Sequence, residues 1–381
     1  MKYKLGDICE IVSGSTPKTS VEEYWDGDIK WITPAELTDD SYIIDDTARK
    51  LTELGVKKTG LTPFPAGTVI LSSRAPIGKV AIAGCEMYCN QGFKNLICSD
   101  KINNKYLYWF LKGNTAFLNS LGRGATFKEI SKGIVGNIEI NVPDVADQEK
   151  AVVNLEKLSE IIKLRKSELE EFDNLIKARF VELFGDPMIN NKGFELRKYG
   201  ELFELNAGGT PSKAKPEYWN GGTISWIGSN MCQNAYIYEN DGNYITEEGM
   251  AHSSARMFPV DTVLVALVGA TIGKTALLKF ETTTNQNVLG IRKIRENGYL
   301  PEFIFYYTQG LYQKFLNIGD GGFAMASKGF ISELPLPVVD IHLQEEFSMF
   351  AEQVDKSKVA VQKSLDETQK LFDSLMQEYF G

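Results

Sequence analysis

Residues 148–184 read QEKAVVNLEKLSEIIKLRKSELEEFDNLIKARFVELF and contain neither Gly nor Pro. An apolar residue recurs every seven positions, at Leu155, Ile162, Leu169, Ile176 and Leu183. The interleaved positions hold Ala151, Leu158 and Phe172, with Arg165 and Arg179 as charged interruptions. An a/d pattern kept for about five heptads is typical of a coiled coil. We therefore predict a coiled-coil helix, about 55 Å long at about 1.5 Å per residue.

The same pattern occurs a second time in residues 344–380. Its seam holds Ala351, Lys358, Leu365, Phe372 and Tyr379, with Phe347, Val354, Val361, Thr368 and Leu375 between them. Two helices of equal length with matching seams are expected to pack against each other. The alternative is a long amphipathic helix that packs on its own domain.

The connection after the first helix favours antiparallel packing. A linker of 9–14 extended residues spans only roughly 30–48 Å at about 3.4 Å per residue. A parallel pair would require this linker to return along most of the helix, whereas an antiparallel pair would not.

Composition indicates an ordinary globular chain of two or three domains in 381 residues. There is no run of eighteen apolar residues and no apolar signal-peptide core, which predicts a cytoplasmic protein without membrane contact. The odd number of cysteines, five, indicates reduced thiols. Because the only histidines, His252 and His342, lie far from Cys85 and Cys89, we expect no metal site and no cofactor.

The net charge of −9 is unevenly distributed along the chain. The excess acid lies in the two helical segments, and the globular segments are close to neutral. A basic face on each globular segment is therefore compatible with the composition.

The two globular segments repeat each other in sequence. Gly14, Thr16, Pro17, Tyr24 and Trp25 correspond to Gly208, Thr210, Pro211, Tyr218 and Trp219. Further along, Trp31-Ile32, Ile77-Gly78-Lys79, Asn90-Gln91 and Ser131-Lys132-Gly133 correspond to Trp226-Ile227, Ile272-Gly273-Lys274, Asn285-Gln286 and Ser327-Lys328-Gly329. Collinear similarity of this extent indicates an internal duplication.

Local patterns predict a mixed α and β domain in each half. The predicted strands are Val69–Leu71, Lys79–Ile82, Val263–Val265 and Thr275–Leu278, and the predicted helices are Asn103–Asn119 and Pro301–Leu316. We predict an α+β fold in which two mixed α/β domains are joined by two long antiparallel coiled-coil helices, with a pseudo-twofold internal repeat. The expected divisions are 1–146, 147–190 (first helix and linker), 191–342 and 343–381 (second helix).

Motifs for catalysis are incomplete. Residues 269–275 (GATIGKT) are one residue short of a phosphate-binding loop, and the equivalent segment around Gly78 and Lys79 also lacks the hydroxyl residue. Asp28 and Lys30 resemble a nuclease pair, but their counterparts are Thr223 and Ser225. Three functions are kept as alternatives to the one inferred below: a stand-alone DNA methyltransferase, a nuclease, and a scaffold without DNA binding.

The doubled motifs resemble the specificity (S) subunit of type I restriction–modification systems. The resemblance rests on the GSTP and GGTP openings, the YW and WI pairs, the IGK and NQ spacing, the QE helix entries and LFGDP at Leu183–Pro187. It covers essentially the whole chain. It implies a non-catalytic subunit whose two target-recognition domains each read one half of a split site on double-stranded DNA. It also implies that the helices set the spacing and dock two methyltransferase (M) subunits, and it leaves open whether restriction (R) subunits join.

Polar residues in the repeated loops are the candidates for DNA contact. Arg74 suits a guanine edge, whereas the second half has Val268 or Gly269 there, which predicts a different half-site. Amides suited to adenine are Asn90, Gln91, Asn285 and Gln286, and residues suited to phosphates are Thr16, Lys18, Lys79, Lys128, Lys132, Thr210, Lys213, Lys274 and Lys328. The alternative for each amide is that it caps a turn. The Tyr-Trp and Trp-Ile pairs are expected in the core, with base stacking as the alternative.

Overall fold

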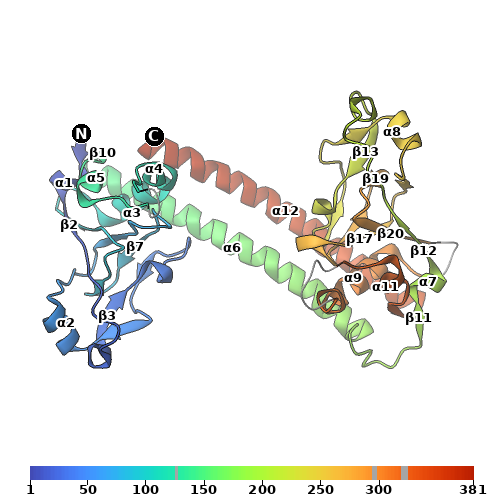
Figure 1. The fold of residues 1–381 in the computed structure, drawn as a ribbon, viewed down its shortest axis with the longest axis horizontal. Coiled ribbons are helices and arrows are strands. Elements are labelled where there is room, and N and C mark those ends of the chain that lie inside the picture. The colour runs from blue at the N-terminus through green and yellow to red at the C-terminus, as the bar shows by residue number, and fades with distance from the viewer. Residues whose placement is uncertain (125–127, 294–297, 319–324) are drawn as a thin grey trace. The chain divides into compact units, whose positions relative to one another are not determined.

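Two helices of 40 residues each, α6 (Val145–Phe184) and α12 (Ile341–Phe380), contribute to both structural units of the chain (Figure 1). The computed structural model describes residues 1–124, 128–293, 298–318 and 325–381. Unit 1 comprises Met1–Lys166 with Gln362–Gly381, and unit 2 comprises Ser167–Val361. Each helix is thus continuous from one unit into the other, and it begins three residues before the predicted heptad pattern.

Contacts within each unit show that the two helices are antiparallel. In unit 1, Asn154 Nδ2 near the start of α6 donates to Tyr379 Oη at the end of α12 (3.0 Å). In unit 2, Lys358 Nζ lies 2.6 Å from Asp173 Oδ1. At the end of α6, Phe180 lies edge-on to Phe347, near the start of α12, with ring centroids 5.1 Å apart. The prediction of an antiparallel pair is confirmed.

The predicted seam residues of both helices are buried or half-buried. Leu155, Ile176, Val354 and Leu365 are buried. The half-buried seam residues are Leu158, Ile162, Leu169, Phe172, Leu183, Val361, Phe372, Leu375 and Tyr379. Each end of the seam merges with the core of the unit that surrounds it, because Leu155 belongs to the core of unit 1 and Ile176 to that of unit 2.

Unit 1 is built on a five-stranded sheet of order β2-β9-β6-β7-β4. Its strands are β2 (Cys9–Val12), β4 (Ile43–Ile44), β6 (Val69–Leu71), β7 (Val80–Ala83) and β9 (Asn95–Cys98). A three-stranded sheet has β3 (Trp25–Ile32), β5 (Arg49–Leu51) and β8 (Tyr88–Cys89), and β1 (Lys2–Lys4) pairs with β10 (Glu139–Asn141). Its short helices are α1 (Leu5–Ile8), α2 (Glu53–Thr59), α3 (Asn104–Gly113), α4 (Thr115–Ser120) and α5 (Lys132–Gly136).

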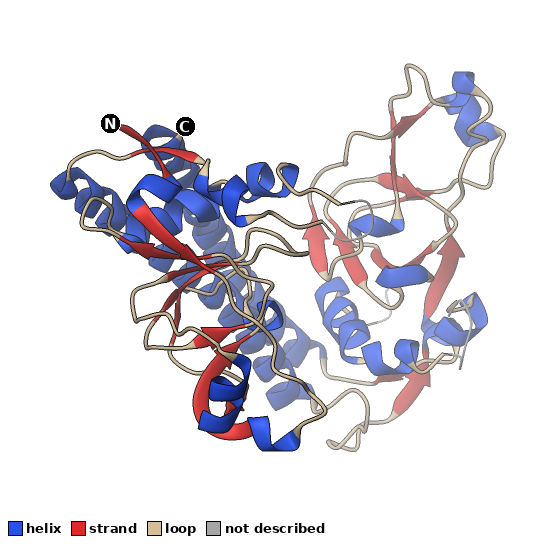
Figure 2. Ribbon diagram, turned by 60° about the vertical axis from the view of Figure 1, so that its left-hand side comes forward, coloured by secondary structure: helices blue, strands red, loops and turns tan. Residues whose placement is uncertain are grey.

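The central sheet of unit 2 has the same strand order as that of unit 1. Figure 2 shows the strands of both units in red and their helices in blue. The five-stranded sheet of unit 2 has the order β12-β20-β17-β18-β14, from β12 (Phe203–Ala207), β14 (Ala235–Ile237), β17 (Val263–Ala266), β18 (Thr275–Leu278) and β20 (Val288–Lys293). A four-stranded sheet contains β13 (Ile224–Ile227), β15 (Tyr244–Ile245), β16 (Met257–Phe258) and β19 (Thr282–Thr284), and β11 (Leu196–Lys198) pairs with β21 (Pro335–Pro337). Its short helices are α7 (Tyr199–Leu202), α8 (Glu247–Ala251), α9 (Pro301–Gly310), α10 (Tyr312–Leu316) and α11 (Lys328–Ser332). The matching strand orders confirm the duplication predicted from sequence.

Both faces of each central sheet are covered, which explains the uninterrupted apolar strands. In β6, Val69 and Leu71 belong to the core that includes α3 and α6, and Ile70 belongs to the core on the opposite face. In β17, Val265 belongs to the core that includes the helices, and Leu264 belongs to the core on the opposite face. The period of two therefore assigns alternate side chains to the helix side and to the small-sheet side.

The two predicted helices after the central sheets are each divided in two. The first is interrupted at Asn114, whose side-chain Nδ2 donates to the Phe110 carbonyl (2.8 Å) at the end of α3. The second is interrupted at Leu311, after Gly310. The prediction of one continuous helix was therefore wrong in both halves. Gly and Asn provide the local reason, because both favour helix ends.

A fully buried glutamine anchors each long helix to its own unit. Gln148 Oε1 accepts from Asn103 N (2.8 Å), and its Nε2 donates to the Lys101 and Pro143 carbonyls. Gln344 makes the equivalent contacts with Leu300 N, Gly298 O and Val339 O. Because each amide satisfies three backbone groups, it fixes the start of its helix against the loop before α3 or α9.

Across the described ranges, none of the helices combines the length and the apolar character that a membrane span requires.

Candidate nucleic-acid interface

The GxTP loop, Gly14–Lys18 in unit 1 and Gly208–Lys213 in unit 2, lies directly on the small sheet. Ser15 N donates to the Cys89 carbonyl (3.0 Å), and Gly209 N donates to the Thr284 carbonyl (2.8 Å). A Cβ at Gly14 would lie 1.8 Å from the Cys89 oxygen. A Cβ at Gly208 would meet the side chain of Thr284 at 2.1 Å. Only glycine permits this backbone approach in either unit.

Replacing Gly14 with alanine is therefore expected to displace the GxTP loop of unit 1. The clash is with backbone, so the neighbour cannot rotate away, and we expect a loss of about 3 kcal/mol of stability or more. Denaturant unfolding measures this loss. Gly133→Ala is the matched control, because the nearest atom to its added Cβ is Ser131 Oγ at 4.0 Å. Equal unfolding midpoints for the two variants would show that the loop is not held as described.

Two tryptophan side chains in each unit donate hydrogen bonds to backbone carbonyls of the GxTP loop. Trp25 Nε1 donates to the Lys18 carbonyl (3.3 Å) and Trp31 Nε1 to the Ser15 carbonyl (3.1 Å). In unit 2 the equivalent bonds join Trp219 to Ser212 and Trp226 to Gly209. The two indoles of unit 1 meet edge-on with centroids 5.1 Å apart, and those of unit 2 at 5.2 Å. The Trp25 and Trp31 side chains are buried, as expected for core residues, whereas Trp219 and Trp226 are half-buried.

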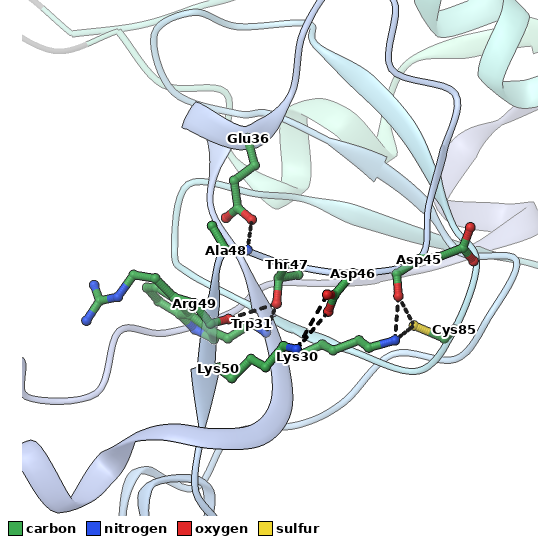
Figure 3. A network of polar contacts seen from close by, with 10 residues as sticks. All are labelled: Lys30, Trp31, Glu36, Asp45, Asp46, Thr47, Ala48, Arg49, Lys50 and Cys85. Carbon is green, nitrogen blue, oxygen red and sulfur yellow. Dashed lines mark hydrogen bonds and ion pairs between the residues drawn. The ribbon is translucent and has the colours of Figure 1, made fainter.

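A polar network in unit 1 holds the segment Asp45–Lys50 against β3 (Figure 3). Thr47 Oγ1 accepts from Trp31 N (3.1 Å) and donates to the Arg49 carbonyl (2.8 Å). Glu36 Oε2 accepts from Ala48 N (2.7 Å). The Arg49 guanidinium lies 3.6 Å from the centroid of the Trp25 ring, a cation–π contact. These contacts fix the tryptophans that carry the GxTP loop.

The NQ turn, Asn90–Gly92 in unit 1 and Asn285–Asn287 in unit 2, lies beside the GxTP loop. Thr16 Oγ1 donates to Gln91 Oε1 (2.6 Å), and Thr210 Oγ1 donates to Gln286 Oε1 (2.5 Å). The structure thus brings together two predicted residues in each unit, and both glutamines are exposed. Because the threonine hydroxyl donates to the amide oxygen, this bond restrains the orientation of each glutamine.

Asn90 and Asn285 shape the NQ turn. Asn90 Oδ1 accepts from Gly92 N (2.8 Å), and Asn285 Oδ1 accepts from Asn287 N (3.0 Å). This is the turn-capping role stated above as the alternative for these amides. Both side chains are half-buried, and in each the amide oxygen accepts the hydrogen bond that closes the turn.

The candidate lysines fall into two groups. Lys79 Nζ donates to the Leu37 carbonyl (2.5 Å) and Lys274 Nζ donates to Gln233 Oε1 (2.9 Å), so both ammonium groups bind protein oxygens. The exposed lysines are Lys18, Lys128, Lys132, Lys213 and Lys328. Lys132 and Lys328 each begin a short helix, α5 and α11, at the same place in the two units.

Arg74 belongs to a charged cluster in unit 1 that we define as Ser73, Arg74, Lys94 and Glu129. Arg74 Nε lies 2.9 Å from Glu129 Oε2, and Lys94 Nζ lies 3.2 Å from Glu129 Oε1. Lys94 Nζ also donates to Ser73 Oγ (3.3 Å). Burial raises the pKa of Glu129, but hydrogen bonds from Arg74 and Lys94 outweigh it, so the pKa lies below its usual value. The carboxylate is therefore charged at neutral pH and joins two cations.

Comparison with known proteins identifies the family. The sequence model described as "Type I restriction modification DNA specificity domain" matches residues 1–172 and 191–368, one match in each half of the chain. The chain belongs to the family of type I restriction–modification specificity subunits. The two matches are its two target-recognition domains, one in each half of the chain.

Similar specificity subunits cover the whole chain or part of it. The type I restriction enzyme MjaIX specificity subunit of Methanocaldococcus jannaschii is 27% identical over 404 residues, 98% of this chain and 90% of the relative. The EcoR124I/EcoR124II specificity subunit of Escherichia coli is 28% identical over 225 residues, 55% of this chain and 52% of the relative. The crystal structure of the S subunit from M. genitalium has the same fold, with a TM-score of 0.61 and 16% identity over 100% of this chain and 96% of that one.

The structure shows what the incomplete catalytic motifs of the sequence form. Residues 269–275 form a turn (Gly269–Thr271) and the start of β18, so they connect two strands and do not lead into a helix as a phosphate-binding loop does. Among the residues with described positions, no group of three or more His, Cys, Asp or Glu side chains could hold a metal ion. Cys85 Sγ instead lies 3.4 Å from the Asp45 carbonyl and 3.3 Å from Lys30 Nζ.

Sequence reasoning missed Lys94 and Glu129 in this specificity subunit. The side chain of Lys94 is only 9% exposed, and that of Glu129 is 34% exposed. A signal existed in the repeat, because both positions are charged in the first half and apolar in the second. Their proximity to Arg74 depends on strand pairing and could not be read from spacing.

Proposed function

We propose that this chain reads a bipartite, asymmetric site on double-stranded DNA for a type I restriction–modification complex. Each target-recognition domain reads one half-site, and methyl transfer and cleavage belong to partner subunits. The observation that carries the proposal is the repeated pairing of the GxTP loop with the NQ turn, through Thr16–Gln91 in unit 1 and Thr210–Gln286 in unit 2. The chain is expected to act in the cytoplasm, where the DNA of the cell lies.

Roles at the interface follow from exposure and existing hydrogen bonds. Exposed Gln91 and Gln286 are the proposed base-reading amides, because a fixed amide can pair with an adenine edge. Asn90 and Asn285 support them. Thr16 and Thr210 orient the amides, and the proposed phosphate contacts are Lys18, Lys128, Lys132, Lys213 and Lys328. Lys79 and Lys274, which are half-buried, are further candidates for phosphate contact.

The two half-sites are expected to differ in sequence. The charged Arg74 of unit 1 has an apolar counterpart, Val268, at the equivalent backbone position of unit 2. Loops of the same architecture but different side chains read different base edges. Arg74→Ala should therefore relax selection at one or two base pairs of the first half-site only.

The partners proposed for this subunit are two methyltransferase (M) subunits, with restriction (R) subunits as additional members in a complete system. The two helices, α6 and α12, are the proposed docking surface. Because the two globular segments are close to neutral and the two long helices are acidic, the isolated chain should bind DNA weakly. Tight binding should require M subunits that enclose the duplex, and affinity should fall by about 0.9 log units per log unit of salt for each phosphate contact.

Single-molecule mapping of adenine methylation tests the proposal directly. Cells with the M gene and the chain should methylate two different short half-sites separated by an unread gap, and cells with the M gene alone should not. A gel-shift series with the chain alone, and with M, measures the contribution of the partner. Nanomolar, sequence-specific binding by the chain alone at physiological salt would contradict the proposed division of labour. Methyl transfer or DNA cleavage by the purified chain, given magnesium, ATP and methyl donor, would show an enzyme instead.

A further inference from the structure

The charged cluster of unit 1 has an apolar counterpart in unit 2 at the same backbone positions. An isolated β-bridge joins Arg74 to Glu129, and an equivalent bridge joins Val268 to Met325. Val268 therefore corresponds to Arg74, and Met325 to Glu129. The arginine–glutamate ion pair of unit 1 is a valine–methionine contact in unit 2.

Strand pairing identifies the remaining equivalences. Leu96 lies opposite the first residue of β6, and Ile291 lies opposite the first residue of β17. Lys94 and Leu289 each lie two residues earlier, so Leu289 corresponds to Lys94. The four equivalents in unit 2, in order, are Leu267, Val268, Leu289 and Met325. The whole cluster has therefore changed from polar to apolar, although the backbone around it is the same.

Within the part of the chain that the structure describes, the contacts of the charged cluster leave the end of Arg74 available. Glu129 holds the Nε atom, and the Arg74 side chain is 45% exposed. A guanidinium fixed at Nε still has its two terminal nitrogens, which form the fork that matches the O6 and N7 atoms of guanine. Lys94 is nearly buried and occupies the second oxygen of Glu129, so the carboxylate cannot turn away from Arg74.

The equivalent position of unit 2 presents an apolar surface. Met325 is 60% exposed and Val268 is half-buried. Leu289 is fully buried where unit 1 has Lys94. An exposed methionine beside a valine offers no hydrogen bond to a base edge. It suits contact with the C5-methyl group of thymine.

We propose that Arg74 reads guanine in the first half-site with Glu129 and Lys94 as positioning residues, and that Val268 and Met325 read a thymine methyl group at the equivalent place in the second. This inference rests on the proposed function and extends it to the base selected by each unit. The same four backbone positions carry charged and polar side chains in unit 1 and apolar side chains in unit 2, and this difference decides which base each unit prefers there.

The test uses the complete chain co-expressed with its M subunit, with methylation mapping and competition binding on DNA libraries as readouts. Glu129→Gln should reduce the preference for guanine at one position of the first half-site by about tenfold, within the range for one bidentate contact. Arg74→Lys should do the same while it keeps the positive charge. Glu129→Asp, which retains a carboxylate, should restore part of the preference. Met325→Ala should reduce a thymine preference in the second half-site by about fourfold, the effect of roughly one buried methylene.

The matched control is Glu204→Gln in unit 2. Glu204 pairs with Arg292 (2.7 Å) and the two side chains are 41% and 39% exposed, close to the exposures of the Glu129–Arg74 pair. This variant should leave the first half-site unchanged. Arg74→Lys retains the Lys94–Glu129 pair, so it carries the test if Glu129→Gln lowers the melting temperature.

The outcomes separate this inference from the proposed function. If the wild-type complex modifies no bipartite site, the proposed function fails. If it does so but Arg74→Lys and Glu129→Gln weaken all sequences equally, Arg74 is a phosphate clamp and the inference fails alone. An unchanged base preference in both variants would also overturn it, as would a second half-site that has no thymine preference sensitive to Met325.

Discussion

A four-residue insertion after Glu171 should widen the unread gap of the DNA site by one or two base pairs. Glu171 lies in the part of α6 with no glycine or proline, and the helix is continuous from unit 1 into unit 2. Four residues add about 6 Å and approximately preserve the seam as a stutter. Six ångströms is close to two base pairs at about 3.4 Å each. Methylation mapping in cells with the M subunit should show the same half-sites further apart.

Two further insertions make this prediction specific to the helix. A two-residue insertion at the same place should rotate the seam by about 200° away from its partner, at about 100° per residue, and abolish modification. Four residues inserted at Asn191, in the turns after α6, leave both helices intact and should not change the gap. An unchanged gap after the insertion at Glu171 would show that the helices do not set the spacing.

Replacing Phe180 with alanine should destabilise unit 2 more than unit 1. Phe180 is 3% exposed and lies against Phe184, Phe303 and Phe347, with ring centroids 4.8, 5.8 and 5.1 Å away. It joins both long helices to α9. Truncating a buried phenylalanine costs about 3–5 kcal/mol, a large part of the stability of a typical domain. Peptide-resolved hydrogen exchange should show peptides of unit 2 exchanging at least about 100-fold faster.

The adjacent residue provides the control for Phe180. Val181 is 45% exposed on the same turn of α6. Val181→Ala should change stability by less than about 0.5 kcal/mol, as is usual for surface positions. If hydrogen exchange in unit 2 is equally slow in both variants, the contacts of Phe180 with the neighbouring phenylalanines do not hold α6 in unit 2.

Periodicity and repetition were sufficient to predict most of the fold. The heptads at Leu155 and Leu365 identified two helices and their mutual packing, because a seam of apolar residues can be buried only by a partner. The strands around Val69 and Val263 were predicted within one residue, since short apolar runs between Gly and Pro are a local signal. The breaks at Asn114 and Leu311 were missed. The apolar pattern continues across them, and the bond from Asn114 to the Phe110 carbonyl competes with the helix.

The interface could be predicted only in part. Thr16 and Gln91 were both named as candidates because each recurs in the second half, but their hydrogen bond joins residues 75 positions apart. Glu129 was not named, because nothing near it in sequence indicates that strand pairing will bring it to Arg74. Contacts made by tertiary structure leave no periodic pattern in the sequence. In this chain the sequence signal for such a contact is that the repeated positions change from charged to apolar together between the two halves.

The charged cluster also limits how a new half-site can evolve. A mutation that removes Glu129 alone leaves the nearly buried Lys94 ammonium without its counterion, which is costly to the folded state. A mutation at Lys94 alone leaves Glu129 with one cation in place of two. Passage from the charged to the apolar version by single substitutions therefore crosses less stable intermediates, and the effects of the neighbouring changes are not additive. Exchange of a whole domain by recombination moves all four side chains in one event, so new specificities of this kind are expected to spread by exchange of domains and not by gradual mutation.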